Sequence, residues 1–492
     1  MPTIYSKEIL GKDRVDGFYD TPLPTVAYIC AKILPRYKPG MKILDPAVGD
    51  GVFLEYFANQ GVRVCDLYGY DIDEEKVTAL QGRYRNVKLF DATNPFGENF
   101  DFIVGNPPYN GDESHFVREN RDRLEKLSIE IGAKNTFSII AYQAIKSLSA
   151  GGCFSMILSD AFLTNTYYKL FRHFLLKNLR IEEMLLAPWK LFHGRSADVR
   201  TCIITGIKKD DWECLFDVAP SQNKVTLIDR VTSEDEYANP RKVDIISQHE
   251  IEKYPNQTFL IGVPKKIRAL YLNPPKRLGD VVEGGTGIST GNDKKFLRKR
   301  SEVEGNAAWV RYYKNGARQP YWYEPEYWIE RDYAPHNKST KNYMIRNEPF
   351  FFKEGITCSS VGVRFSAAYL PQGCLFGVNA NFFFVDRTSL FYTLGLLNTK
   401  LSWYFARRVL IRTNNISANY LRLLPYIEPH SSVKQEIART VEQVVNGLKR
   451  DGNFDFAATQ AQLDKTFFEL YEFDKHLQAE VHDFCDNFYE RL

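Results

Sequence analysis

The sequence predicts an α/β fold with a doubly wound parallel sheet, followed by a mixed α+β region and C-terminal helices, and three observations indicate it. From about Thr25 to Gly206, short apolar runs alternate with amphipathic stretches, as strands and helices do around a parallel sheet. The second half of the chain is dense in aromatic residues and short β-like runs punctuated by Gly and Pro. From Ser431 onward the periodicity is helical again.

Six runs are candidates for the strands of the first domain: residues 42–47, 66–73, 100–108, 153–160, 182–188 and 201–209. A charged, poorly patterned stretch at 229–244 is the expected linker region. We therefore expect three parts, namely residues 1–235, 236–430 and 431–492. The first would be a catalytic or ligand-binding α/β domain and the second a recognition domain, with the third a helical segment.

Length and composition agree with a folded, multidomain protein. The 492 residues exceed one ordinary core, and 44% hydrophobic with 25% charged residues is typical of soluble globular chains. No run reaches the roughly 18 uncharged apolar residues of a membrane helix, and the polar start is no secretory signal. We expect a cytoplasmic protein without a membrane partner. The eight cysteines include no Cys-x-x-Cys pair, so neither disulfides nor a metal site are expected.

The net charge of +3 hides an uneven distribution. Residues 260–430 hold 25 Lys plus Arg against 13 Asp plus Glu, so the rest of the chain is acidic. A basic region joined to an acidic one is what a nucleic-acid binder with a separate catalytic body shows. A merely solvated basic surface explains the charge equally well.

A glycine-rich turn and two acidic residues mark the ends of consecutive predicted strands. The run 45–57 leads from an apolar strand into an amphipathic helix, and Gly49 and Gly51 let its backbone approach a ligand. Asp71 ends the next strand, where nucleoside-binding folds grip ribose, and Asp91 ends the one after. The Walker loop and the Gly-x-Gly-x-x-Gly spacing are absent, which disfavours ATP and NAD.

Asp-Pro-Ala-x-Gly-x-Gly-x-Phe-Leu, at 45–54, resembles the S-adenosylmethionine loop of amino-methyltransferases at every fixed position. The resemblance implies a Rossmann-like class I methyltransferase domain of seven strands, with S-adenosyl-L-methionine as cofactor. It places the methionine end at the loop, the ribose at Asp71 and the adenine amine at Asp91. The segment 17–22 resembles the one that closes over the methionine moiety, although a helix start explains it equally well. The implied cofactor-binding residues are Thr21, Pro22, Asp45, Pro46, Ala47, Gly49, Gly51, Asp71, Ile72, Asp91, Ala92 and Asn106.

Asn106-Pro107-Pro108-Tyr109 follows an apolar strand, and α/β sheets bind ligands at that carboxyl end. An aromatic exocyclic amine is a poor nucleophile because its lone pair is delocalised into the ring. The Asn106 side-chain oxygen and the Pro107 carbonyl can each accept one N–H and aim that lone pair at a methyl donor. The prolines fix the carbonyl, and Tyr109 can stack on the target ring. We predict that these four residues are catalytic.

The tetrapeptide resembles the signature of adenine-N6 and cytosine-N4 methyltransferases, and it also occurs in enzymes that act on protein glutamine or rRNA guanine. Within that family it accompanies adenine far more often, so adenine is the expected base. The second half resembles the specificity region of type II adenine methyltransferases of the TaqI kind, through runs at 284–297, 311–324, 351–376 and 394–426. The order of motifs is that of the gamma class.

A base inside a duplex must be flipped out to reach such a pocket. By resemblance Phe192 packs on the far face of the flipped adenine, opposite Tyr109, although simple core burial is the alternative. The expected DNA-binding residues are Thr290, Asn292, Lys294 and Lys295, through backbone N–H groups and cations. The Tyr and Trp residues of 312–328 can read bases or form a small core. Ser159 and His193 depart from the family, which usually has Pro at both positions.

The expected function is therefore site-specific adenine-N6 methylation of double-stranded DNA in restriction-modification or phage defence. A methyltransferase of RNA or protein is one rival, and a DNA-binding subunit of a larger defence complex is another. A monomer is expected, with a separate restriction endonuclease or defence subunits as possible partners. About sixteen residues precede the 17–22 segment, too few for a nuclease domain, and the Glu74–Lys76 match to a nuclease motif suits a helix start better. We expect methylation without cleavage.

Overall fold

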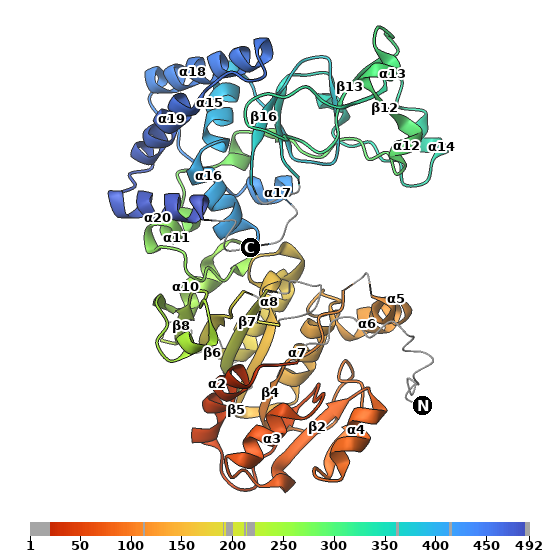
Figure 1. Cartoon of the computed structure of the whole chain (residues 1–492), viewed down its shortest axis with the longest axis vertical. Helices are drawn as coiled ribbons and strands as arrows, with labels where there is room; N and C mark the ends of the chain where they lie inside the picture. Colours follow the sequence, from red (N-terminus) through yellow and green to blue (C-terminus); the bar gives the residue numbers. More distant parts are fainter. Residues whose placement is uncertain are drawn as a thin grey trace. The chain divides into compact units, whose positions relative to one another are not determined.

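The computed structural model describes residues 20–111, 114–189, 191–192, 200–210, 213, 222–360, 364–412 and 416–487. It divides into two compact units, Met1–Gly262 and Val263–Leu492 (Figure 1). The sequence predicted three parts, but the structure groups the C-terminal helices with the region before them. In the second unit, helix α15 (Arg387–Leu397) packs along α18 (Ser431–Arg450).

A nine-stranded sheet forms the centre of the first unit, in the order β3-β2-β1-β4-β5-β7-β6-β8-β9. Pairing is parallel from β3 across to β5, and β7 is antiparallel to both β5 and β6. The strands are β1 (Ile43–Asp45), β2 (Leu67–Asp71), β3 (Asn86–Leu89), β4 (Phe100–Gly105), β5 (Leu148–Ser159), β6 (Leu179–Leu186), β7 (Thr201–Lys208), β8 (Lys224–Ile228) and β9 (Val243–Ser247).

The first seven strands have the Rossmann-like methyltransferase arrangement that the sequence predicted, and the α/β fold class is confirmed. The expected count of seven was too low, because β8 and β9 extend the sheet. The stretch 229–244, expected as a linker, holds the 3-10 turn Glu234–Tyr237 and the start of β9. Only some side chains of these edge strands are buried, which explains their weak hydrophobic pattern.

Helices cover both faces of this sheet. They are α2 (Leu23–Ile33), α3 (Val52–Asn59), α4 (Glu74–Gln81), α5 (His115–Glu119), α6 (Arg121–Leu127), α7 (Thr136–Lys146), α8 (Lys169–Asn178) and α10 (Gln248–Lys253). Neighbouring strand residues point to opposite faces: Ile43 and Phe102 join one buried cluster, with α2 and α3, while Leu44 and Ile103 join the other, with α7 and α8. Burial on both faces gives the sheet its continuous apolar runs.

The second unit contains two four-stranded sheets, β11-β18-β15-β16 and β12-β14-β13-β17, and a β10-β19 pair. Their strands are β10 (Lys276–Arg277), β11 (Glu283–Gly284), β12 (Leu297–Lys299), β13 (Trp309–Tyr313), β14 (Tyr327–Glu330), β15 (Gly355–Cys358), β16 (Ala367–Leu370), β17 (Leu375–Phe376), β18 (Asn381–Phe383) and β19 (Pro425–Tyr426).

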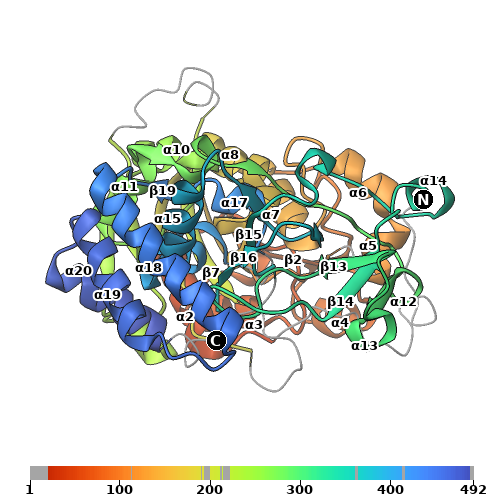
Figure 2. The same ribbon diagram turned by 90° about the horizontal axis from the view of Figure 1, so that it is seen from above.

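The helices of this unit are α11 (Lys265–Leu272), α12 (Asp293–Phe296), α13 (Arg300–Val303), α14 (His336–Ser339), α15, α16 (Lys400–Tyr404), a π-helix (Phe405–Leu410), α17 (Ala418–Leu421), α18, α19 (Ala457–Leu470) and α20 (Lys475–Asp486). Figure 2 shows α15 beside α18 in a second view. None of the helices in the described ranges combines the length and apolar character needed to cross a membrane.

Candidate active site

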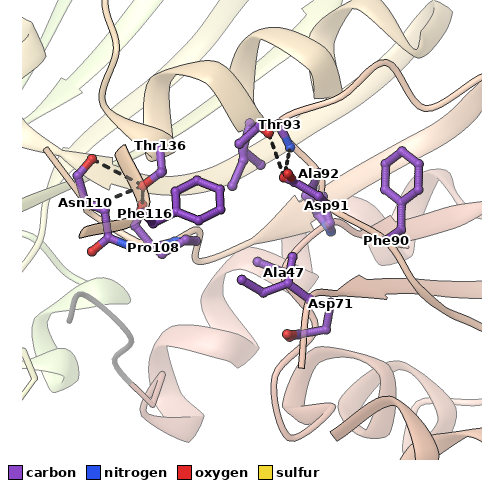
Figure 3. Close-up of a pocket in the computed structure, with 13 residues that line it drawn as sticks. Ala47, Asp71, Phe90, Asp91, Ala92, Thr93, Pro108, Asn110, Phe116 and Thr136 are labelled. Carbon is purple, nitrogen blue, oxygen red and sulfur yellow. Dashed lines mark hydrogen bonds between the residues drawn. The ribbon is translucent and has the colours of Figure 1, made fainter. Parts of the chain in front are cut away.

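A hollow lies at the carboxyl ends of β1, β2 and β4, beside the segment that follows β3 (Figure 3). Residues from the loops after all four strands line it. Six of them were expected at a cofactor: Pro46, Ala47, Asp71, Ile72, Asp91 and Ala92. The others are Phe90, Thr93, Pro108, Asn110, Phe116, Thr136 and Ile140, so apolar and aromatic side chains form much of the wall. An apolar wall with a few polar groups is the lining typical of a small-molecule site.

Asp71 joins the glycine-rich loop to the end of β2. Its carboxylate accepts the N–H of Gly49 at 2.8 Å and the N–H of Asp73 at 2.9 Å. The side chain is buried, which raises its pKa, while these two backbone N–H groups counteract that rise. Because a carboxylate has about four lone-pair positions, Asp71 can accept further hydroxyl groups at the hollow.

Two positions beside the predicted loops favour glycine, Gly51 mainly by its left-handed φ and Gly105 by close approach. Gly51 has φ +83° at the start of α3, and a Cβ there would stand 2.7 Å from the Leu80 side chain. Gly105 has φ +149°, and a Cβ on it would stand 2.7 Å from Asp45 Oδ1. The end of β4 therefore lies directly against Asp45.

Asp45 is fully buried and its Oδ1 accepts the N–H of Ala47 at 3.1 Å. Burial raises the pKa of Asp45 to about 7, and the nearby charge of Asp71 adds to that rise. Asp45, Gly49 and Gly51 support the loop from behind and are not among the residues that line the hollow.

The Asn106 amide is held from two directions. Its Nδ2 donates to Thr21 Oγ1 at 3.1 Å, and its Oδ1 accepts the Tyr109 hydroxyl at 2.6 Å. Thr21 and Pro22 directly precede α2, and the Thr21 side chain makes no capping bond to that helix. Thr25, one turn into α2, bonds Glu234 and Tyr237, so the segment after β8 anchors the helix that begins beside Thr21.

Residues outside the tetrapeptide fix its backbone. The Thr136 hydroxyl donates to the Pro108 carbonyl at 2.6 Å and accepts the Asn110 N–H at 2.9 Å, and the Thr136 N–H donates to the Asn110 carbonyl at 3.0 Å. Within the described residues no donor reaches the Pro107 carbonyl. That oxygen and Asn106 Oδ1 are thus two acceptors on one rigid turn after β4.

The rings of Tyr109 and Phe192 lie 6.3 Å apart and are tilted by 43°. To hold a base between them, two rings must be parallel and about 7 Å apart, which is twice the contact distance of carbon atoms. One of the two rings must therefore turn to admit a base. Phe192 is half-buried against one core cluster of the sheet, whereas His193 lies outside the described residues.

In the second unit, the expected DNA-binding residues divide into two groups. Thr290 is buried and its hydroxyl donates to Asp293, which pairs with Lys314. Lys294 and Lys295 are exposed on α12, and Asn292 caps that helix through the Lys295 N–H at 3.2 Å. Thr290 is therefore buried within the second unit, whereas the two lysines lie at its surface.

The aromatic residues of 312–328 form mainly a core. Tyr312, Tyr313, Tyr321 and Tyr323 are buried, and the hydroxyls of Tyr312 and Tyr323 donate to the Ile288 and Gly316 carbonyls. Of the two alternatives, core packing describes these tyrosines. Across the described ranges no three His, Cys, Asp or Glu side chains group as a metal site would require.

Comparisons with known proteins agree with this architecture. Residues 68–188 match the model of the Eco57I restriction-modification methylase family. The type II methyltransferase M.VspI of Vibrio sp. (strain 343) is 25% identical over 292 residues, covering 57% of this chain and 66% of that protein. The adenine-specific methyltransferase PglX of Lacticaseibacillus casei (strain Zhang) is 28% identical over 232 residues, covering 42% and 19%. This chain is thus similar to restriction-modification methyltransferases, and it spans less than two thirds of these two relatives.

Among solved structures, the type IIL restriction-modification enzyme MmeI in complex with DNA aligns with a TM-score of 0.56 at 12% identity. The alignment covers 95% of this chain and 75% of that one. The shared fold therefore extends through both compact units.

Proposed function

We propose that this chain is a DNA methyltransferase that transfers a methyl group from S-adenosyl-L-methionine to N6 of adenine at specific sites. The observation that carries the proposal is the turn after β4. Its Pro108 lines the same hollow as Asp71 and Asp91, and the two residues before it provide the acceptors Asn106 Oδ1 and the Pro107 carbonyl. A hollow with two carboxylates in its lining, on the same turn as two amine acceptors, suits transfer to an amino group. The likeness to type II methyltransferases supports DNA as substrate.

The residues present fit the cofactor. The Asp71 carboxylate would accept the ribose hydroxyls, with Ile72 beside it, and Asp91 with Ala92 would face the adenine between apolar walls that include Phe90 and Phe116. Pro46 and Ala47 would line the methionine end, with the glycines supporting their loop from behind and Thr21 and Pro22 closing over it. When bound, S-adenosylmethionine supplies an electrophilic methyl group on a sulfonium.

At the target, the chain's own groups position an amine. Asn106 Oδ1 and the Pro107 carbonyl would each accept one N–H of adenine N6 and direct its lone pair at the methyl carbon. Transfer of the methyl group to N6 would break its bond to sulfur, and the resulting ammonium would then release one proton to solvent. A strong base is not needed, since the methylated ammonium is acidic. Tyr109 and Phe192 would hold the flipped ring once one of them has turned.

Adenine is proposed over cytosine because the Asn-Pro-Pro-Tyr resemblance favours it and because the related PglX is described as adenine-specific. The exposed lysines of α12 would contact DNA phosphates, together with Asn292, and Thr290 would support their loop. A restriction endonuclease or a defence complex would be the partner in the cell.

Sequencing the genomic DNA of an expressing host with modification-sensitive reads tests the proposal. We expect N6-methyladenine at one recurrent motif, and none in a host that expresses Asn106→Ala. N4-methylcytosine at the motif would correct the base. An unmodified genome alongside methylated RNA or protein would contradict DNA as substrate.

A further inference from the structure

Asp91 is held by a network that no sequence motif indicated. Its Oδ1 accepts both the N–H of Thr93, at 3.0 Å, and the Thr93 hydroxyl, at 2.6 Å. Its Oδ2 accepts Arg123 Nη2 at 2.8 Å. Arg123 comes from α6, 32 residues further along the chain, and Figure 3 shows Asp91 and Thr93 side by side in the wall of the hollow.

Arg123 contacts three residues of the loop after β3, of which Asp91 is one. Its Nη1 donates to Thr93 Oγ1 at 3.0 Å and to Asn94 Oδ1 at 2.9 Å, and its Nε donates to Asn120 Oδ1 at 3.3 Å. A guanidinium has five N–H donors and no acceptor. The Thr93 oxygen must therefore accept from Arg123 and give its own proton to Asp91. Each hydrogen bond that leads from Arg123 through Thr93 to Asp91 therefore has a defined donor and acceptor.

These contacts limit how many further hydrogen bonds the Asp91 carboxylate can accept. A carboxylate has about four lone-pair positions, and the described residues fill both on Oδ1 and one on Oδ2. One acceptor position remains, on a side chain that is only 17% exposed and lines the hollow with Phe90 and Phe116. A ligand edge that donates an N–H satisfies that position, whereas a carbonyl oxygen there would face a carboxylate.

We propose that Arg123 is a specificity-determining positioning residue, which orients Asp91 so that its one remaining acceptor selects a 6-amino purine over a 6-oxo purine. This inference rests on the proposed S-adenosylmethionine site and adds to it the residue that sets the choice of nucleobase. Arg123 would act through Asp91 and not by touching the adenine. Lysine could not replace it, because a single ammonium lacks the planar fork that spans Asp91, Thr93 and Asn94.

Binding of two ligands to the full chain tests this role. The probes are S-adenosylhomocysteine and its 6-oxo analogue S-inosylhomocysteine, titrated calorimetrically into the wild type, Arg123→Met and Arg121→Met. Arg121 is an exposed arginine at the start of the same helix and controls for the change in charge. We expect Arg123→Met to weaken the adenosyl ligand about tenfold, as when a hydrogen bond to a charged group is removed, and the inosyl ligand less than about twofold. Arg121→Met should change neither.

An equal loss for both ligands would show that Arg123 only tethers α6, and an undiminished preference for the adenosyl ligand would likewise overturn the proposal. If Arg123→Met fails to fold, as judged by its thermal unfolding, Thr93→Val interrupts the same network with a side chain of similar shape. It should also lower the preference, and an unchanged preference in that variant would refute the role. Wild-type protein that binds neither ligand would instead contradict the proposed cofactor itself.

Discussion

The proposed cofactor half of the site, at Asp71, and its proposed target half, at Asn106, are held by different kinds of contact. At the cofactor half, the Asp71 carboxylate is fixed by backbone N–H groups of Gly49 and Asp73, which adjoin the ends of neighbouring strands. At the target half, the Asn106 amide is fixed by the side chains of Thr21, 85 residues away, and Tyr109. The first half thus depends on sheet register, and the second on side chains that can turn.

The largest effect should come from the target half. We expect Asn106→Ala to lower the rate of methyl transfer by about 10²- to 10³-fold, the usual cost of removing a fixed polar group from a reacting centre. Cofactor affinity should stay nearly unchanged, because Asn106 acts on the amine. Rates with duplex DNA and calorimetric titration with S-adenosylmethionine measure the two. If the affinity for S-adenosylmethionine falls in parallel with the rate, Asn106 does not act on the target amine alone, and the two halves are not separate.

A smaller effect, on cofactor affinity and not on the rate of transfer, should come from the cofactor half. Asp71→Ala should weaken S-adenosylmethionine binding about tenfold or more, because the ribose hydroxyls would lose a charged acceptor worth about 1.5 to 3 kcal/mol. At saturating cofactor the rate should recover most of its wild-type value. Glu74→Ala, which removes an exposed carboxylate from the first turn of the following helix α4, is the matched control. A cofactor dissociation constant that Asp71→Ala leaves unchanged would mean that the ribose binds elsewhere.

Substitutions at Tyr109 separate stacking from hydrogen bonding within the target half. Tyr109→Ala should lose about 1 to 3 kcal/mol of target-base binding, as base–aromatic stacking does. Tyr109→Phe keeps the ring and removes only the hydroxyl that donates to Asn106 Oδ1, so its rate should remain within a few-fold of wild type. The KM for DNA and kcat of both variants distinguish these outcomes. Equal losses in the two variants would show that the hydroxyl, and not the ring, matters.

The smallest effect concerns the second unit. The double variant Lys294→Ala, Lys295→Ala should flatten the salt dependence of DNA binding, by about 0.9 in the log-log slope for each phosphate that the lysines no longer neutralise. Arg300→Ala is the control, since Arg300 is exposed but paired with Glu304 at 2.7 Å. Binding measured from low to moderate salt gives the slopes. An unchanged slope in the double variant would remove α12 from the DNA-binding surface.

The ends of β1, β2, β3 and β4 could be predicted from sequence because each one is a local signal. An apolar run followed by Gly, Asp or Asn-Pro-Pro-Tyr fixes both the strand and the residue at its end, and parallel pairing then brings those ends to one edge. Asp71 beside Gly49 follows from that register alone.

Other features could not be predicted because they depend on contacts between distant segments. Arg123 and Thr136 are ordinary residues in helix-forming runs, and only packing brings them to Asp91 and the tetrapeptide. The second unit is harder still, because its tyrosines look alike in sequence whether they are buried or exposed. The sequence therefore left two interpretations of 312–328 open, and side-chain burial was needed to choose between them.

The central claim is that this chain methylates an adenine amine in DNA and that the turn after β4 holds that amine. The most direct measurement is nucleoside mass spectrometry of unmodified duplex DNA after incubation with the purified chain and methyl-labelled S-adenosylmethionine. We predict label in N6-methyl-2′-deoxyadenosine, and none when Asn106→Ala replaces the wild type. Label in N4-methylcytosine, or DNA that stays unlabelled while the chain binds both cofactor and DNA, would contradict it.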